Sequence, residues 1–133
     1  MKYLLLVIIS FLSSHALADD SYFCLSDGGK SVLLVPKNYS NINTVLYYPY
    51  LKPIKISKVT KTRYGDTGGE KPEVFNTMNE IINGKVTGKY VFNIQGYIIN
   101  YVDYINLKTK KKTTFLLKNG EDFRLKDIDC LSF

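Results

Sequence analysis

Histidine, tryptophan and cysteine are scarce in this sequence of 133 residues, which has one histidine, no tryptophan and two cysteines. The histidine, His15, precedes a signal-peptide-like cleavage pattern that ends at Ala18, so we expect the mature chain to contain none. Such a chain lacks the side chain that most often serves as general base at neutral pH, and it lacks imidazole metal ligands. This excludes Ser-His-Asp and Cys-His catalysis. We therefore expect no enzymatic activity, no metal site and no cofactor.

Residues 1–18 have the features of a secretory signal peptide. Lys2 precedes an apolar run, 4–12, and a short polar stretch then leads to Ala16-Leu17-Ala18, a small-x-small cleavage pattern. The apolar run is about half of the roughly 20 residues that a membrane-spanning helix needs. The sequence therefore predicts cleavage near Ala18 and a bacterial periplasmic or secreted location. It also predicts a single mature domain, residues 19–133, without a transmembrane segment.

The two cysteines, Cys24 and Cys130, stand near opposite ends of the mature chain. In an exported protein an even cysteine count predicts a disulfide. A redox-active pair needs close spacing such as C-x-x-C, which these residues do not have. A structural bond that closes so long a loop contributes at most about 4.7 kcal/mol to the free energy of unfolding in the chain-entropy account.

Short runs of alternating or apolar residues, separated by turn residues, predict an all-β domain. The sequence predicts an antiparallel β-barrel or sandwich of about seven to nine strands. Residues 73–82 are ambiguous, because their apolar positions also fit a short helix. Asn83-Gly84 follows directly and is the strongest short hairpin signal, so we favour a strand there. The strands expected elsewhere are 21–26, 31–36, 44–48, 54–64, 85–94, 97–106 and 113–117.

The stretch 86–117 combines tyrosines with lysines. Val86, Tyr90, Phe92 and Ile94 alternate with polar residues, which predicts a strand with these four side chains on its buried face. Residues 107–112 predict a turn, and this turn contains four lysines at Lys108, Lys110, Lys111 and Lys112. Asp103 interrupts an apolar strand, and we expect a lysine or a tyrosine hydroxyl to pair with it.

Two interpretations of this stretch stay open. Either the tyrosines cover the sheet and the lysines keep a hairpin soluble, or together they bind a partner. The net charge of +6 favours an anionic partner, and export argues against nucleic acid. We expect the partner to be a protein or an anionic envelope component. The candidate binding residues are Thr87, Lys89, Tyr90, Tyr104, Lys108, Lys110, Lys111 and Lys112.

The ends of the mature chain carry a resemblance. The stretches "SYFCLSDGGKSVLLV" and "LKDIDCLSF" place Cys24 and Cys130 much as in the small periplasmic inhibitors of c-type lysozyme and the related adhesin-complex proteins. The resemblance implies a small antiparallel β-barrel with a disulfide near its ends. It also implies a periplasmic inhibitor or immunity-type protein that acts on a secreted enzyme such as a lysozyme. The family's inhibitory loop reads S-G-x-x-Y, and the nearest match is Thr87-Gly88-Lys89-Tyr90, one residue shorter.

Overall fold

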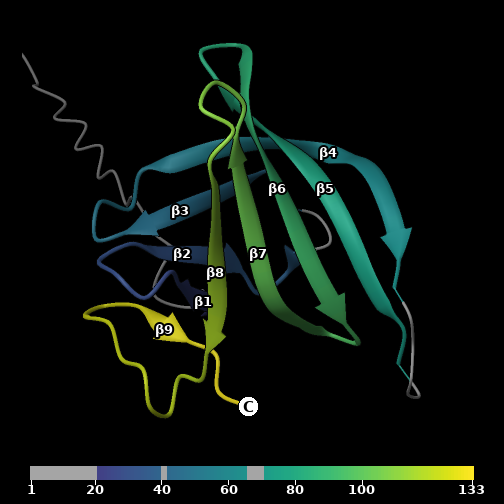
Figure 1. Cartoon of the computed structure of the whole chain (residues 1–133). Coiled ribbons are helices and arrows are strands. Elements are labelled where there is room, and N and C mark those ends of the chain that lie inside the picture. Colours follow the sequence, from purple (N-terminus) through teal and green to yellow (C-terminus); the bar gives the residue numbers. More distant parts are fainter. Residues whose placement is uncertain (1–20, 40–41, 66–70) are drawn as a thin grey trace, which may run out of the picture.

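The computed structural model describes residues 21–39, 42–65 and 71–133, and within them the chain forms nine β-strands and no α-helix (Figure 1). The predicted signal peptide and its cleavage site lie outside the described residues. Within the described part, no helix is long and apolar enough to cross a membrane. The strands are β1 (Ser21–Ser26), β2 (Val32–Pro36), β3 (Thr44–Tyr48), β4 (Pro53–Tyr64), β5 (Glu73–Ile82), β6 (Lys85–Gln95), β7 (Ile98–Asn106), β8 (Lys112–Lys118) and β9 (Asp129–Cys130).

The first eight strands close into an antiparallel barrel. Each strand from β1 to β7 pairs with the next one along the chain, and β8 returns to β1, where Leu25 lies opposite Leu117. The short β9 pairs in parallel with the first residues of β1, with Cys130 opposite Tyr22, while the later residues of β1 pair with β8. Closure pairs every one of the eight strands on both sides. The structure thus confirms the predicted all-β class and selects the barrel.

Residues 73–82 form strand β5, as the Asn-Gly signal indicated, and not the alternative helix. Asn83 and Gly84 both have positive φ, 52° and 76°, and they join β5 to β6 in a two-residue turn. This is the backbone conformation that Asn-Gly favours in tight hairpins. The strand pairs with β4 on one side and β6 on the other, so its backbone hydrogen bonds are used in the sheet.

The barrel interior contains the main hydrophobic core. Alternate residues of the strands point inward, as the period of two requires. Apolar burial of this extent is the main driving force that stabilises the closed ring. The buried members are Phe23, Leu25, Leu33, Val35, Val45, Ile56, Met78, Tyr90, Phe92, Ile94, Ile99, Val102 and Phe115.

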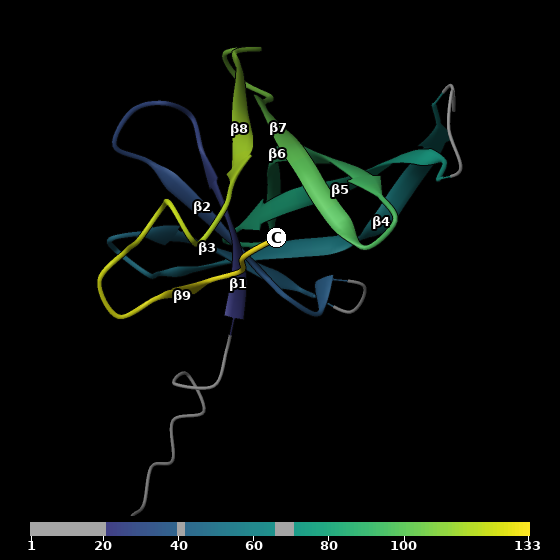
Figure 2. The same cartoon turned by 90° about the horizontal axis from the view of Figure 1, so that it is seen from below.

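A second, smaller core lies outside the barrel, between β1–β3 and the residues that precede and include β9. We call residues 119–130 the C-terminal segment. Outward residues of the first strands, such as Tyr22 and Leu34, pack here with Phe123 and Ile128 of that segment. Figure 2 shows the segment in yellow beside β2 and β3. The segment therefore covers a sheet face that would otherwise expose apolar side chains to water.

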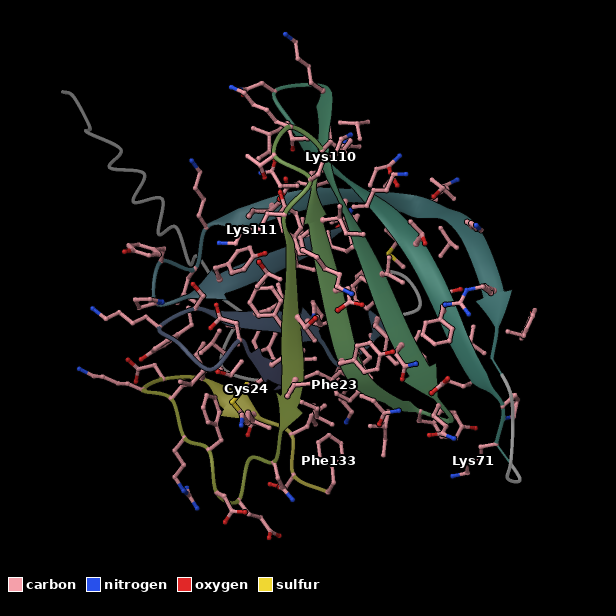
Figure 3. The ribbon with its side chains drawn as sticks, in the orientation of Figure 1. Phe23, Cys24, Lys71, Lys110, Lys111 and Phe133 are labelled. Carbon is pink, nitrogen blue, oxygen red and sulfur yellow. A yellow bond between two sulfur atoms is a disulfide. The ribbon has the colours of Figure 1, made fainter. Side chains whose placement is uncertain are left out.

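A disulfide joins Cys24 to Cys130, with the two Cα atoms 5.6 Å apart (Figure 3). This confirms the predicted pairing. The bond anchors the C-terminal segment to β1 inside the smaller core, where both cysteines are buried. A disulfide in this position indicates an oxidising compartment.

Candidate functional site

Four connections of the barrel meet at one end. In an antiparallel barrel built from consecutive strands, alternate connections lie at the same end, because successive strands run in opposite directions. Residues 27–31, 49–52, 83–84 and 107–111 connect β1–β2, β3–β4, β5–β6 and β7–β8, and we call this end, together with the first residues of β6 and β8, the basic end. Its lysines are Lys30, Lys52, Lys85, Lys108, Lys110, Lys111 and Lys112.

Carboxylates are rare at the basic end. Asp27 is the one acidic residue in the four connections, and its Oδ1 accepts a hydrogen bond of 2.8 Å from the backbone N–H of Gly29. Acidic residues gather instead in the C-terminal segment, at Glu121, Asp122, Asp127 and Asp129. Positive charge therefore exceeds negative charge in the four connections, and positive potential concentrates where they meet.

The lysine-rich turn between β7 and β8 is held by its own hydrogen bonds. The Asn106 side-chain Oδ1 accepts from the backbone N–H of Lys108 at 2.9 Å and of Thr109 at 3.0 Å. The Lys110 N–H donates to the Asn106 carbonyl at 2.8 Å, and Lys110 has φ of 64°. A non-glycine residue is uncommon in this left-handed conformation. The turn therefore keeps a lysine where glycine or asparagine would be less strained.

The structure brings the predicted lysines together. Residues 107–111 form the turn, as expected, while Lys112 is already the first residue of β8. Across the sheet Lys89 pairs with Ile105, and Ile105 pairs with Lys112, so the two lysines flank one outward-facing isoleucine. Lys110 and Lys111 stand in the upper part of Figure 3, far from Lys71 at the opposite end of the barrel.

The predicted residues Thr87, Tyr90 and Tyr104 instead meet inside the barrel, around Glu80. Glu80 is 4% exposed. Its Oε1 accepts hydrogen bonds of 2.7 Å from both the Thr87 hydroxyl and the Tyr104 hydroxyl, and its Oε2 accepts one of 3.1 Å from Tyr90. The Tyr90 hydroxyl also lies 2.8 Å from the Tyr47 hydroxyl. We call these five residues the Glu80 network.

A β-bulge explains how Thr87 reaches this network. The register of β5 and β6 shifts between Glu80 and Ile81, which leaves Thr87 as the extra residue on β6. A bulge of this kind redirects a side chain. The bulge also reverses which side chains of β6 point inward before Tyr90. Val86 is therefore exposed, and the prediction that it lies on the buried face is wrong. Tyr90 itself is fully buried, as predicted, so its side chain does not reach a partner directly.

Burial and the Glu80 carboxylate keep the three phenols of the network protonated. Burial raises the pKa of Tyr47 to about 12, and the nearby charge of Glu80 acts in the same direction. Burial also raises the pKa of Tyr90 and of Tyr104, and the Glu80 carboxylate adds to both effects. Neutral phenols can donate hydrogen bonds to a carboxylate. The network thus supplies Glu80 with hydroxyl donors inside a largely apolar interior.

Gly88, in the stretch nearest to the inhibitory-loop motif of the resembling family, has a structural role. A methyl group on Gly88 would come within 2.6 Å of the Tyr104 ring, so the glycine makes room for that ring on the neighbouring strand. Asp103, directly before Tyr104 on β7, accepts a hydrogen bond of 2.6 Å from the Thr114 hydroxyl. The structure therefore corrects the expected lysine or tyrosine partner of Asp103.

A groove, which the sequence analysis missed, opens at the basic end. Its volume is about 740 Å³, and its lining includes the aromatic residues Tyr47, Tyr48 and Tyr50, together with Pro49, Ile54, Ser31, Lys30 and Lys52. A second hollow of about 460 Å³ shares Lys52 and Ile54 with the first and continues to the Asn83-Gly84 turn. The signal was present in the letters "YYPYLK" (47–52), but a proline after a strand resembles an ordinary strand end.

The β3–β4 connection, which borders the groove, contains a conformationally strained residue. Leu51 has φ of 54°, and its backbone N–H donates a 2.7 Å hydrogen bond to the Tyr47 carbonyl. The left-handed conformation costs roughly 1–2 kcal/mol for a residue with a side chain. Next to Leu51, the Tyr50 side chain is 85% exposed. The loop therefore maintains an unfavourable backbone conformation while it holds an aromatic ring in solvent.

In the part of the chain that the structure describes, no group of three or more histidine, cysteine, aspartate or glutamate residues lies close enough to hold a metal ion. Comparison of the chain with protein-family models, with curated proteins and with solved structures gives no match.

Proposed function

We propose that this chain is an exported, non-catalytic binding protein that holds an anionic component of the cell envelope or surface at its basic end. One observation carries the proposal. A lysine occurs in or directly after each of the four connections that meet there, and Asp27 is the one carboxylate in those connections. A surface whose charges serve only solubility usually has both signs interspersed, so charge of one sign on four separate loops indicates a further role.

The close spacing of the lysines on the β7–β8 turn supports this function. Lys108, Lys110, Lys111 and Lys112 fall within five consecutive positions, so their like charges repel one another, an effect that salt screens over about 8 Å under physiological conditions. A bound anion removes this repulsion and gains from several ammonium groups at once. Binding that depends on these exposed charges must weaken as salt rises.

The rigid scaffold below the basic end limits the conformational entropy that its loops lose on binding. The closed barrel, the Cys24–Cys130 bond and the Glu80 network restrict the strands that bear the four connections. Loops on a rigid scaffold lose less conformational entropy when they bind. The disulfide and the signal-peptide pattern of residues 1–18 support a periplasmic or secreted location, where anionic envelope components are accessible.

Inhibition of a secreted enzyme such as a lysozyme remains a prediction from the resemblance. The stretch Thr87–Tyr90 lies within β6, with Thr87 directed to Glu80 and Tyr90 buried. The two positions that match the serine and tyrosine of the inhibitory loop are therefore turned inward, and an inhibitory contact would have to come from other residues.

Chromatography on immobilised heparin, a sulfated polysaccharide, tests the proposal. One variant changes Lys108, Lys110, Lys111 and Lys112 to glutamine. The matched control changes four lysines away from the basic end, Lys37, Lys61, Lys71 and Lys118, to glutamine, so that both variants have the same net charge. We expect the first variant to elute at clearly lower salt than the control, with stability within about 0.5 kcal/mol of the parent, as for most surface substitutions. Coincident elution of the two variants would show that only net charge matters and would contradict the proposal.

A further inference from the structure

The groove at the basic end has the dimensions and lining of a ligand site. Its volume of about 740 Å³ falls within the roughly 300–1,000 Å³ typical of sites for small ligands. Tyr47, Tyr48 and Tyr50 provide ring surface, and Lys30 and Lys52 provide charge. The lining contains no carboxylate. A ligand that fits this chemistry has both a negative group and a surface that packs on aromatic rings.

Backbone pairing restricts the class of ligand further. Extended peptides commonly bind by adding a strand to a free sheet edge. The groove is bordered by β3, which pairs with β2 on one side and with β4 on the other, so the barrel offers no free edge there. Recognition must then come from ring faces and ammonium groups. The C–H faces of pyranose sugars pack on aromatic rings in this way, and their carboxylate, sulfate or phosphate groups pair with lysine.

The second hollow indicates an extended ligand. It shares Lys52 and Ile54 with the groove, adds Lys55 and reaches the β5–β6 turn, next to which Lys85 begins β6. The two hollows together make a path from the β1–β2 connection across the β3–β4 connection to the β5–β6 turn. Lysines recur along this path. A chain of several sugar units fits it better than a single ring does.

We propose that this path is the binding site of an acidic oligosaccharide, with Tyr50 as an exposed platform for a pyranose ring and Lys30 and Lys52 as partners of its anionic groups. This inference rests on the proposed function for the sign of the ligand's charge. It adds the chemical class of the ligand and the position at which it binds. The strain at Leu51 and the 85% exposure of Tyr50 are then features of a loop shaped for a ligand.

The test compares single-tyrosine variants at the two ends of the barrel. Tyr50→Ala removes the platform, and Tyr97→Ala is the matched control, because Tyr97 is 86% exposed at the opposite end. The probe is a galacturonic acid hexasaccharide, measured by calorimetry at low salt. We expect Tyr50→Ala to weaken binding about tenfold or more, the loss expected for one stacked ring. We expect Tyr97→Ala to bind as the parent does.

Three further probes distinguish the failure of this inference from the failure of the proposed function. They are a neutral galactose hexasaccharide, a hexaglutamate peptide and vesicles of phosphatidylglycerol. Tighter binding of the peptide or the vesicles than of the acidic sugar overturns the inference and leaves the proposed function intact. Equal binding of the acidic sugar by Tyr50→Ala and by the parent has the same meaning. Equal binding of the neutral and acidic sugars would show that the ligand's charge is not recognised, which contradicts both the proposed function and this inference. Absence of binding to every anionic probe overturns both proposals.

Discussion

The hydroxyl of Tyr47, a residue of the groove wall, lies 2.8 Å from the hydroxyl of Tyr90, whose ring is fully buried inside the barrel. Tyr90 in turn donates to Glu80, which is also the acceptor for Thr87 and Tyr104. The open groove and the buried network therefore share one chain of hydrogen bonds. The hydrogen bond to Tyr90 holds the Tyr47 side chain in the groove wall from the interior of the barrel.

Tyr90→Phe tests the energetic weight of the Glu80 network. The substitution keeps the ring but removes the hydroxyl that serves both Glu80 and Tyr47. Loss of one partner of a buried polar group costs about 1–3 kcal/mol. We expect a decrease of this size in the free energy of unfolding, measured by urea denaturation. Tyr97→Phe, at an exposed position, is the control, and equal stability of the two variants would show that the Tyr90 hydroxyl contributes nothing to stability.

Alkaline pH should destabilise the fold through the same phenols. The pKa of Tyr47 is raised from 10.0 to about 12 in the folded chain, and the pKa values of Tyr90 and Tyr104 are raised as well. The unfolded chain then loses protons first, so the stability that these phenols contribute is complete below pH 10 and decreases as pH rises from there. Urea denaturation at several alkaline pH values measures the decrease. We expect a shallower pH dependence for Tyr90→Phe, and an unchanged one would contradict the assignment.

Gly88→Ala tests the close approach of β6 and β7. The added methyl group would lie 2.6 Å from the Tyr104 ring, so either the Tyr104 side chain or one of the two strands must shift. Overpacking of this kind costs typically about 1–3 kcal/mol. We expect a lower thermal midpoint for the variant. In a double-mutant cycle, Tyr104→Ala should remove most of the penalty of Gly88→Ala, and strictly additive effects would show that the ring is not the cause.

The fold was predictable where the signal is local. Asn83-Gly84 marks a turn, alternation from Tyr90 to Ile94 marks a strand, and two cysteines in an exported chain mark a disulfide. Closure of the barrel was not predictable, because the pairing of Leu25 with Leu117 joins distant segments and leaves no local pattern. The bulge at Thr87 reversed the expected burial of Val86, since one extra residue changes the face of every position before it.

The candidate site was predictable only in part. The four lysines between Lys108 and Lys112 are close in sequence, so their cluster is visible without a structure. The groove combines Lys30 with Tyr50, and these residues become neighbours only because β2 pairs with β3, with Val32 opposite Tyr48. Tyr90 was expected on a buried face, but its partners were not predictable, because the inward faces of β5, β6 and β7 bring Glu80, Tyr90 and Tyr104 together only in the folded sheet.

The central claim is that the basic end is the binding surface, and nuclear magnetic resonance of isotope-labelled protein tests it most directly. Titration with the galacturonic acid hexasaccharide at low salt will identify the backbone amides that respond. The account predicts the largest shifts in residues 27–31, 49–55, 83–85 and 107–112, with a smaller response at the opposite end, for example at Gly96 and Tyr97. Shifts that are largest in the C-terminal segment, or spread evenly over the barrel, would contradict it.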